Sequence, residues 1–122
     1  MHVTPDRQNG QAMETPTGEV IFELIGEAVT PDLEAGHSLA RIRIPSGKSS
    51  SLHYHKVTKE TYYIIRGEAG MQVNGEEFKL LPGQVCYLEP GDVHKVQNHG
   101  KEDLEFLAYC VPAWVPDDSF DV

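Results

Sequence analysis

Two histidines and a glutamate lie close together near the middle of this chain. His53 and His55 are separated by one residue, and Glu60 follows five residues later. In a β-strand, alternate side chains project from the same face, so both imidazoles would point the same way. Segments 51–55 and 61–66 have strand character, and the short polar segment between them is consistent with a tight connection. Two histidines and a carboxylate are the ligand set of metal sites with open positions.

A further histidine, His94, follows a Pro-Gly turn and begins a later strand-like segment. If the strands close into a barrel, inward positions of distant strands face each other, and these imidazoles and the carboxylate would surround one ion. Four protein ligands on a six-coordinate ion leave about two positions for water or a bidentate substrate. A structural zinc site is more often closed and rich in cysteine, so this set favours catalysis or substrate binding. Taken singly, a histidine such as His94 is more often an ordinary surface or core residue than a ligand.

Composition limits what the whole chain can be. Its 122 residues, 39% of them hydrophobic, suit one domain with a single core, and the net charge is −9. This acidic balance argues against nucleic acid or an anionic membrane as a partner. The chain has neither an apolar run long enough to span a bilayer nor the apolar stretch of a secretory signal, so we expect a cytoplasmic protein. Cys86 and Cys110 are expected to be buried free thiols.

Short strand-like segments separated by turn signals make up most of the chain. Asn74-Gly75 is the clearest hairpin signal, because a type I′ turn needs positive φ at both central residues. No segment has a sustained helical period, so we predict an all-β sandwich or barrel. We expect an N-terminal arm at 1–18, the barrel at 19–111 and a C-terminal tail at 112–122. The strands expected outside the histidine region are 19–25, 37–44, 70–73, 76–80, 84–89, 94–98 and 103–111.

These spacings resemble the two motifs of the cupin superfamily. The first motif is matched by Gly47, His53, His55, Glu60 and Gly67, and the second by Gly83, Glu89-Pro90-Gly91, His94 and Asn98. Glu89 stands where the family usually has a proline, which should alter only the local turn. The resemblance covers about residues 19–111 and implies a double-stranded β-helix, that is, a single-domain jelly-roll cupin barrel. It also implies a divalent metal ion (Mn, Fe, Zn, Ni or Cu) bound by His53, His55, Glu60 and His94.

Other side chains could take part in such a site. Tyr62 shares a strand face with Glu60, and its phenol could orient a substrate, donate a proton, or simply pack. Arg41 shares a strand face with Arg43 and could grip a substrate carboxylate with its guanidinium, or instead face solvent or another subunit. We therefore take Tyr62 and Arg41 as catalytic candidates, with Glu89 as a spare general base.

Two orientations stay open at this point. The inward set of the last strand is either Phe106, Ala108 and Cys110 or Glu105, Leu107 and Tyr109. Trp114 could cap a barrel end, form a dimer contact or pack as an ordinary aromatic. We expect His2, His37 and His99 to lie on the surface, away from the metal ligands.

The resemblance does not select one function, because cupins include many enzyme classes as well as non-enzymatic binders. We expect a metal-dependent enzyme of the dioxygenase, isomerase or decarboxylase type. Its substrate would be a small oxygenated molecule, such as a carboxylic acid, diol, enol or sugar derivative, chelated to the metal. The alternatives are a non-catalytic binding or sensor protein and a structural or storage protein. The resemblance also suggests a homodimer, in which the arm 1–18 could exchange a strand between subunits.

Overall fold

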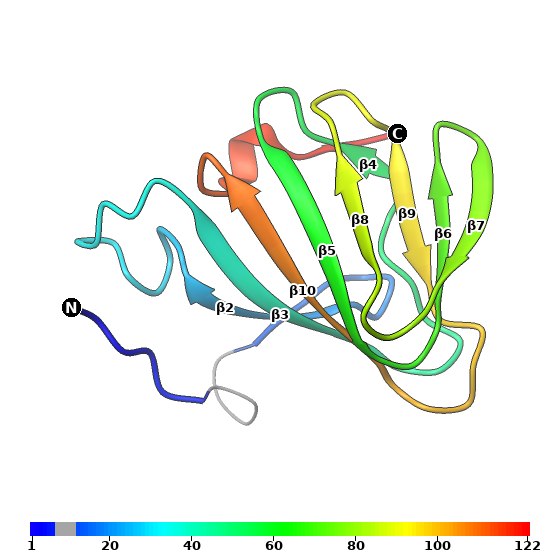
Figure 1. Ribbon diagram of the computed structural model, residues 1–122. Helices are drawn as coiled ribbons and strands as arrows, with labels where there is room; N and C mark the ends of the chain where they lie inside the picture. Colours follow the sequence, from blue (N-terminus) through cyan, green and yellow to red (C-terminus); the bar gives the residue numbers. More distant parts are fainter. Residues whose placement is uncertain (7–11) are drawn as a thin grey trace.

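The computed structural model describes residues 1–6 and 12–122, which form two antiparallel β-sheets that face each other (Figure 1). The six-stranded sheet has the order β1-β2-β3-β10-β5-β8, and the five-stranded sheet has the order β11-β4-β9-β6-β7. A 3-10 turn, η1 (Pro116–Asp118), precedes the last strand. The strands are β1 (Met13–Glu14), β2 (Val20–Ile25), β3 (Ser38–Ile44), β4 (His53–Tyr54), β5 (Lys59–Arg66), β6 (Ala69–Val73), β7 (Glu76–Leu80), β8 (Val85–Leu88), β9 (His94–Gln97), β10 (Leu104–Val111) and β11 (Phe120–Asp121).

Alternation of side chains along the strands places the core between the two sheets. On β10, Phe106, Ala108 and Cys110 are buried, while the residues between them face outward, which settles the orientation left open by the sequence. Burial of these apolar side chains is the main force holding the sheets together. The members of this core with no more than 2% exposure are Ile44, Tyr62, Ile64, Ala69, Met71, Leu88, Val96, Leu104 and Phe106.

Two glycine-containing turns explain residues that the sequence singled out. Asn74 and Gly75 have φ of 50° and 85° and join β6 to β7, which confirms the predicted hairpin. Gly67 has φ of 82°, and a Cβ atom there would lie 2.9 Å from the carbonyl oxygen of Asp103. A larger residue at Gly67 would therefore be disfavoured by both the backbone conformation and the close approach.

The topology brings the predicted ligands to one end of the barrel. His53 on β4 pairs directly with His94 on β9, and Glu60 projects from β5 in the opposite sheet. Residues 112–122, in red in Figure 1, run across this end beside β4, and β11 pairs with β4. The C-terminal segment is thus part of the sheet next to the site and not a loose tail.

The N-terminal residues contact the outside of the six-stranded sheet. The Thr4 hydroxyl donates a hydrogen bond to the carbonyl oxygen of Leu24 at 2.8 Å. Residues 7–11 of the predicted arm lie outside the described residues. Within the described part of the chain, no helix is long and apolar enough to span a membrane. Cys86 and Cys110 are both buried and free, as predicted.

Candidate metal centre

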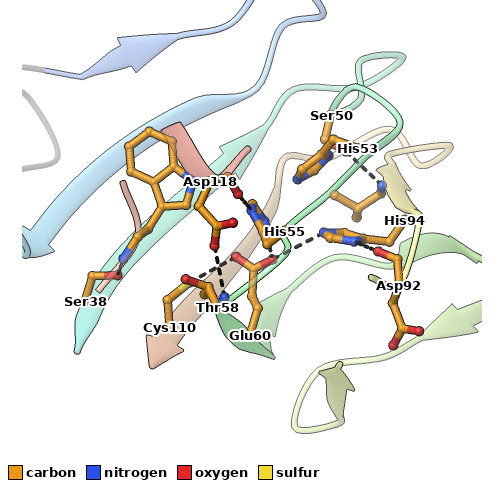
Figure 2. Close-up of polar contacts among 12 residues, drawn as sticks. Ser38, Ser50, His53, His55, Thr58, Glu60, Asp92, His94, Cys110 and Asp118 are labelled. Carbon is orange, nitrogen blue, oxygen red and sulfur yellow. Dashed lines mark hydrogen bonds and ion pairs between the residues drawn. The ribbon is translucent and has the colours of Figure 1, made fainter. Parts of the chain in front are cut away.

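His53, His55, Glu60 and His94 converge inside one end of the barrel (Figure 2). One potential ligand atom from each side chain lies within 4.8 Å of the other three. The Nε2 atoms of His55 and His94 are 3.4 Å and 3.2 Å from Oε1 of Glu60. The structure therefore brings together all four residues that the sequence selected as metal ligands.

Each imidazole is held from behind by a backbone carbonyl. The Nδ1 atoms of His55 and His94 lie 2.7 and 2.8 Å from the carbonyl oxygens of Asp118 and Asp92, respectively (Figure 2). Nδ1 of His53 lies 2.9 Å from the carbonyl oxygen of Ser51. Because a carbonyl oxygen only accepts hydrogen bonds, each Nδ1 is assigned the hydrogen, which leaves the Nε2 lone pairs directed at the centre. Metal-binding histidines are commonly oriented in this way.

The inner atoms of the group lack protein partners. Nε2 of His55, Nε2 of His94 and Oε1 of Glu60 are buried without a hydrogen bond from the described residues. With the hydrogens on Nδ1, all three are acceptors, and the two Nε2 atoms lie 3.4 Å and 3.2 Å from Oε1 of Glu60. Buried acceptors in this arrangement require a proton or a cation between them. The donor set and its orphaned acceptors therefore fit a divalent metal ion.

The electrostatics of Glu60 and His53 favour the protonation states that a metal requires, whereas at His55 burial is outweighed by the hydrogen bond and charge of Glu60, which raise its pKa. Burial alone would raise the pKa of Glu60, but His55 and His94 outweigh it and hold this pKa well below its usual range. Burial, reinforced by His94, lowers the pKa of His53, which favours its neutral form. A carboxylate beside neutral imidazole suits a transition-metal ion.

Cys110 is a neighbour of the site whose role the sequence did not show. Its Sγ lies 3.3 Å from Oε2 of Glu60 and is assigned as the donor. Burial, and then the charge of Glu60, raise the pKa of the Cys110 thiol well above its usual range, so the thiol keeps its proton. This contact occupies one carboxylate oxygen and leaves Oε1 facing the histidines. The alternation of side chains along β10 was the sequence feature that could have placed Cys110 at the site, but it allowed either set of side chains to face inward.

Asp118, in η1, supports the site from the C-terminal segment. Its backbone carbonyl holds His55, and its carboxylate accepts hydrogen bonds from the backbone N–H groups of Lys56, Val57 and Thr58 at 2.8–3.2 Å. These three residues belong to the segment that connects His55 to Glu60. Asp118 thus fixes the segment between two ligands, although it is far away in sequence and has no motif that would have marked it.

A cavity of about 540 Å³ adjoins the metal ligands. His53, His55 and Glu60 line one part of it, and Glu19, Ile21 and Glu23, from the edge of the six-stranded sheet, line another. Its volume lies within the range of small-molecule sites in proteins. Trp114 also lines it, with its backbone N–H donating to the Ser38 hydroxyl at 2.9 Å.

Tyr62 lies in this cavity wall, on the same side as the ligands. Its side chain is 2% exposed, packs against Phe106 at a ring-centroid distance of 4.7 Å and approaches His94 edge-on at 6.1 Å. Burial raises the pKa of Tyr62 well above its usual range, so the phenol is neutral. The position is compatible with either packing or a contact with substrate, and its catalytic role stays a prediction.

Arg41 lies on the other side of the sheet, which corrects the expectation that it reaches the metal site. Ala40 and Ile42 line the cavity, so the alternation of β3 directs Arg41 outward. There it forms an ion pair with Glu105 at 3.2 Å and lines a separate pocket of about 250 Å³ beneath N-terminal residues. Arg43, on the same outer face, lies 5.4 Å from the ring centroid of Phe22.

The remaining candidates are also outside the cavity. Glu89 is exposed and is not among the residues that line it. His2, His37 and His99 do not belong to the described group of potential ligands. His37 instead packs against Tyr109 on the outer face of the sheet, with ring centroids 5.3 Å apart.

A comparison with protein families places the chain in the cupin family. The family model for a cupin domain matches residues 40–111, and the chain therefore belongs to that family. The predicted single-domain jelly-roll barrel is confirmed by solved structures with the same fold. One of them, described as a predicted oxalate decarboxylase from Thermotoga maritima, is 29% identical with a TM-score of 0.71 and covers 84% of this chain and 90% of that one.

Curated relatives extend this comparison. An oxalate-binding protein of Thermotoga maritima is 40% identical over 72 residues, which are 59% of this chain and 60% of that protein. An uncharacterised protein of Methanocaldococcus jannaschii is 30% identical over 105 residues, covering 86% of this chain and 82% of that protein. The match thus spans somewhat less than two thirds of the oxalate-binding relative and most of the second relative.

Proposed function

We propose that this protein is a metal-dependent enzyme that acts on a small carboxylic acid held by a divalent ion. The observation that carries the proposal is the convergence of imidazole nitrogens and a carboxylate oxygen that lack any donor between them. His53, His55, Glu60 and His94 would hold the ion, for which Mn, Fe, Zn, Ni and Cu are all chemically suitable. Four protein ligands leave two positions on a six-coordinate ion, enough for adjacent oxygens of one substrate.

The bound ion would supply Lewis-acid polarisation and a template for adjacent substrate oxygens. The chain supplies the orientation of the ligands, through the backbone carbonyls behind the imidazoles, and a cavity that would receive the substrate beside the ion. The neutral phenol of Tyr62, in the cavity wall, is our candidate for a contact with the substrate.

Oxalate is the first ligand to test. The Thermotoga maritima relative is named an oxalate-binding protein, and the similar crystal structure is described as a predicted oxalate decarboxylase. A quercetin 2,3-dioxygenase of Bacillus subtilis is also related, at 24% identity over 87 residues. We therefore infer chemistry of the decarboxylase or dioxygenase type, with an isomerase as a less supported type. Ligand binding without turnover is the alternative, favoured by the name of the oxalate-binding relative.

The test combines metal analysis with ligand binding and product detection. We expect the purified protein to retain or take up about one ion per chain, and to bind oxalate only when loaded with metal. Glu60→Ala should remove both properties, while His37→Ala, which removes a histidine outside the site, should keep them. Release of formate or carbon dioxide would establish decarboxylation, and binding without product would support the non-catalytic alternative. Failure to bind any of the five candidate metals would refute the proposal.

We also infer that the protein forms a homodimer through the outer face of the six-stranded sheet. Tyr63 and Ile65 on β5, Val85 and Tyr87 on β8 and Tyr109 on β10 are 40–53% exposed on adjacent strands. An apolar surface of this kind is typical of an interaction site, and a second copy would cover it. Light scattering should give the mass of two chains, and Tyr63→Glu should shift it to one. A cytoplasmic location remains a proposal supported by the free thiols.

A further inference from the structure

Glu19 is a cavity residue that the metal centre does not use. It immediately precedes β2, its side chain lines the cavity, and the residue is 8% exposed. Both of its backbone groups are fixed, because the Thr15 N–H donates to the Glu19 carbonyl at 2.9 Å and the Glu19 N–H donates to the Thr15 hydroxyl at 3.1 Å. Glu19 is therefore held in the wall of the cavity that His53, His55 and Glu60 also line.

The environment of this carboxyl group favours its neutral form. Within the described part of the chain, no side-chain hydrogen bond or ion pair satisfies it. Burial, and then the charge of Glu60, raise the pKa of Glu19 to about 7. An ion bound by Glu60 would offset the second cause and leave the first. A buried carboxyl group that keeps its proton is a hydrogen-bond donor.

The rest of the cavity offers little to a second anion. Among the described residues that line it there is no lysine or arginine, whereas Glu23 and Asp121 add two more acidic side chains. Both are engaged: Glu23 accepts from the Ala28 N–H at 3.1 Å, and Asp121 accepts from the Ser51 hydroxyl at 2.9 Å. An anionic group placed away from the metal would therefore be desolvated without a cationic partner.

The size of the cavity points to a ligand longer than oxalate. About 540 Å³ is far more than a two-carbon acid needs. Ile21, Ile42, Ala108 and Trp114 give the wall an apolar component that could contact an uncharged chain or ring. The metal end can chelate the acid group of such a ligand while the remainder extends into the cavity.

We propose that the preferred ligand has a chelating acid group at the metal and an uncharged body whose oxygen accepts a hydrogen bond from Glu19. This inference rests on the proposed function, because it assumes that the acid group binds the ion. Glu19 would be a specificity-determining residue that recognises a neutral carbonyl or hydroxyl oxygen, while the lack of a lysine or arginine among the described lining residues disfavours a second carboxylate. Long dicarboxylates should accordingly bind poorly.

Two matched probes test the proposal on the metal-loaded full chain. 2-Oxoglutarate and its methyl ester at the far carboxyl group share the same chelating 2-oxo acid and differ in the charge of the other end. By calorimetry at about pH 6, the ester should bind at least about tenfold more tightly than the diacid. Equal affinity, or tighter binding of the diacid, would overturn the proposal.

Variants of Glu19 identify the interaction. Glu19→Gln keeps a neutral donor and should keep the preference for the ester, whereas Glu19→Ala should weaken ester binding about five- to tenfold. Pyruvate carries the chelating group alone, so its affinity should be unchanged in both variants. Glu27→Gln, the loss of an exposed carboxylate outside the cavity, should leave ester affinity unchanged. Equal ester affinity in wild type and Glu19→Ala would contradict a role for Glu19.

The same series separates this proposal from the proposed function. If oxalate and pyruvate bind but the larger probes do not, the cavity takes only short acids, and the inference about Glu19 fails while the proposed function stands. If none of these acids binds the metal-loaded protein, both fail. Metal content and a melting curve for each variant show whether the variant has kept its fold and its metal centre.

Discussion

The two ends of the cavity are built in different ways. At the metal end, each imidazole is fixed from behind by a carbonyl, and Glu60 is fixed by Cys110. At the other end, the backbone of Glu19 is fixed, but its carboxyl group faces the cavity without a partner among the described residues. The metal end orients its ligands for an ion, whereas the other end leaves the Glu19 carboxyl group available to donate a hydrogen bond to a ligand in the cavity.

The two ends of the cavity also differ in how far along the chain their supporting residues lie. The loop between His55 and Glu60 carries two ligands, and Asp118 from the other end of the chain holds that loop. Glu19 depends mainly on Thr15, only a few residues away. We infer that the metal end is the more rigid part of the cavity, because more independent contacts fix it. The following predictions measure how far this contrast holds.

Metal binding should have the largest effect on stability. An ion that binds only the folded state stabilises it by mass action, by about 4 kcal/mol when the free ion exceeds its dissociation constant a thousandfold. Added metal should therefore raise the melting temperature of the wild type, and chelation should reverse the change. His94→Ala should abolish this response, whereas His37→Ala should retain it. An undiminished response in His94→Ala would show that the stabilising ion binds elsewhere.

The opposite end of the cavity should make the stability of the protein depend on pH. A carboxyl group whose pKa rises from 4.5 to about 7 on folding holds its proton more tightly in the folded state, so it destabilises the protein increasingly as the pH rises. Glu19→Gln removes this effect. In metal-free protein, the free energy of unfolding of Glu19→Gln relative to that of the wild type should increase by about 2–3 kcal/mol between pH 5 and pH 8.

Denaturant unfolding of both proteins at the two pH values measures this change. Other titratable groups line the same cavity, namely Glu23, His53, His55, Glu60 and Asp121. Their contributions to the pH dependence of stability largely cancel in the difference between variant and wild type. Glu27→Gln, at an exposed position, is the control for the loss of a carboxyl group. The pH-dependent gain should shrink when metal is bound, because the ion offsets the charge of Glu60. If the gain in stability of Glu19→Gln does not depend on pH, the pKa of Glu19 is not raised in the folded state.

Asp118 links the C-terminal segment to the metal end. Asp118→Ala would leave the backbone N–H groups of the loop at Lys56, Val57 and Thr58 without their acceptor. We expect a loss of about 1–3 kcal/mol in the free energy of unfolding, together with weaker metal binding. Asp117→Ala, at the exposed neighbouring residue, should cause neither. Unchanged metal affinity in Asp118→Ala would mean that the hydrogen bonds from the loop to Asp118 are not needed to position the metal ligands.

The ligands could be predicted from sequence because their geometry is largely local. The spacing of His53 and His55 fixes a common strand face, and Asn74-Gly75 specifies its own turn through backbone conformation. His94 required the further assumption of a closed barrel, which the family resemblance supplied. The all-β fold could also be predicted, because alternating apolar residues and turn residues recur along the chain.

The supporting residues could not be predicted in this way. Alternation says that neighbours on a strand face opposite sides, but it does not say which side is inside. Both orientations of Arg41 therefore stayed open, and its candidate role at the metal site was wrong. Cys110 was subject to the same ambiguity. Asp118 and Glu19 act through contacts between segments whose placement depends on the folded barrel, and no local pattern encodes such contacts.

The smallest effect should come from the contact between Cys110 and Glu60. A thiol is a weak donor, so Cys110→Ala should reduce metal affinity by less than about tenfold, at the lower end of what the loss of a ligand's supporting hydrogen bond costs. Cys110→Ser retains a donor and should keep the affinity of the wild type. Cys86→Ala removes the other buried thiol and controls for the loss of packing.

Competition with a metal chelator measures these affinities. If Cys110→Ala and Cys86→Ala lose the same affinity, the effect comes from the core and not from the hydrogen bond to Glu60. A loss confined to Cys110→Ala and restored by Cys110→Ser would instead show that the carboxylate, like the imidazoles, is oriented from behind. The metal end would then be preorganised at all four ligands, and Glu19 would be the acid, among the described residues that line the cavity, left to bind the ligand itself.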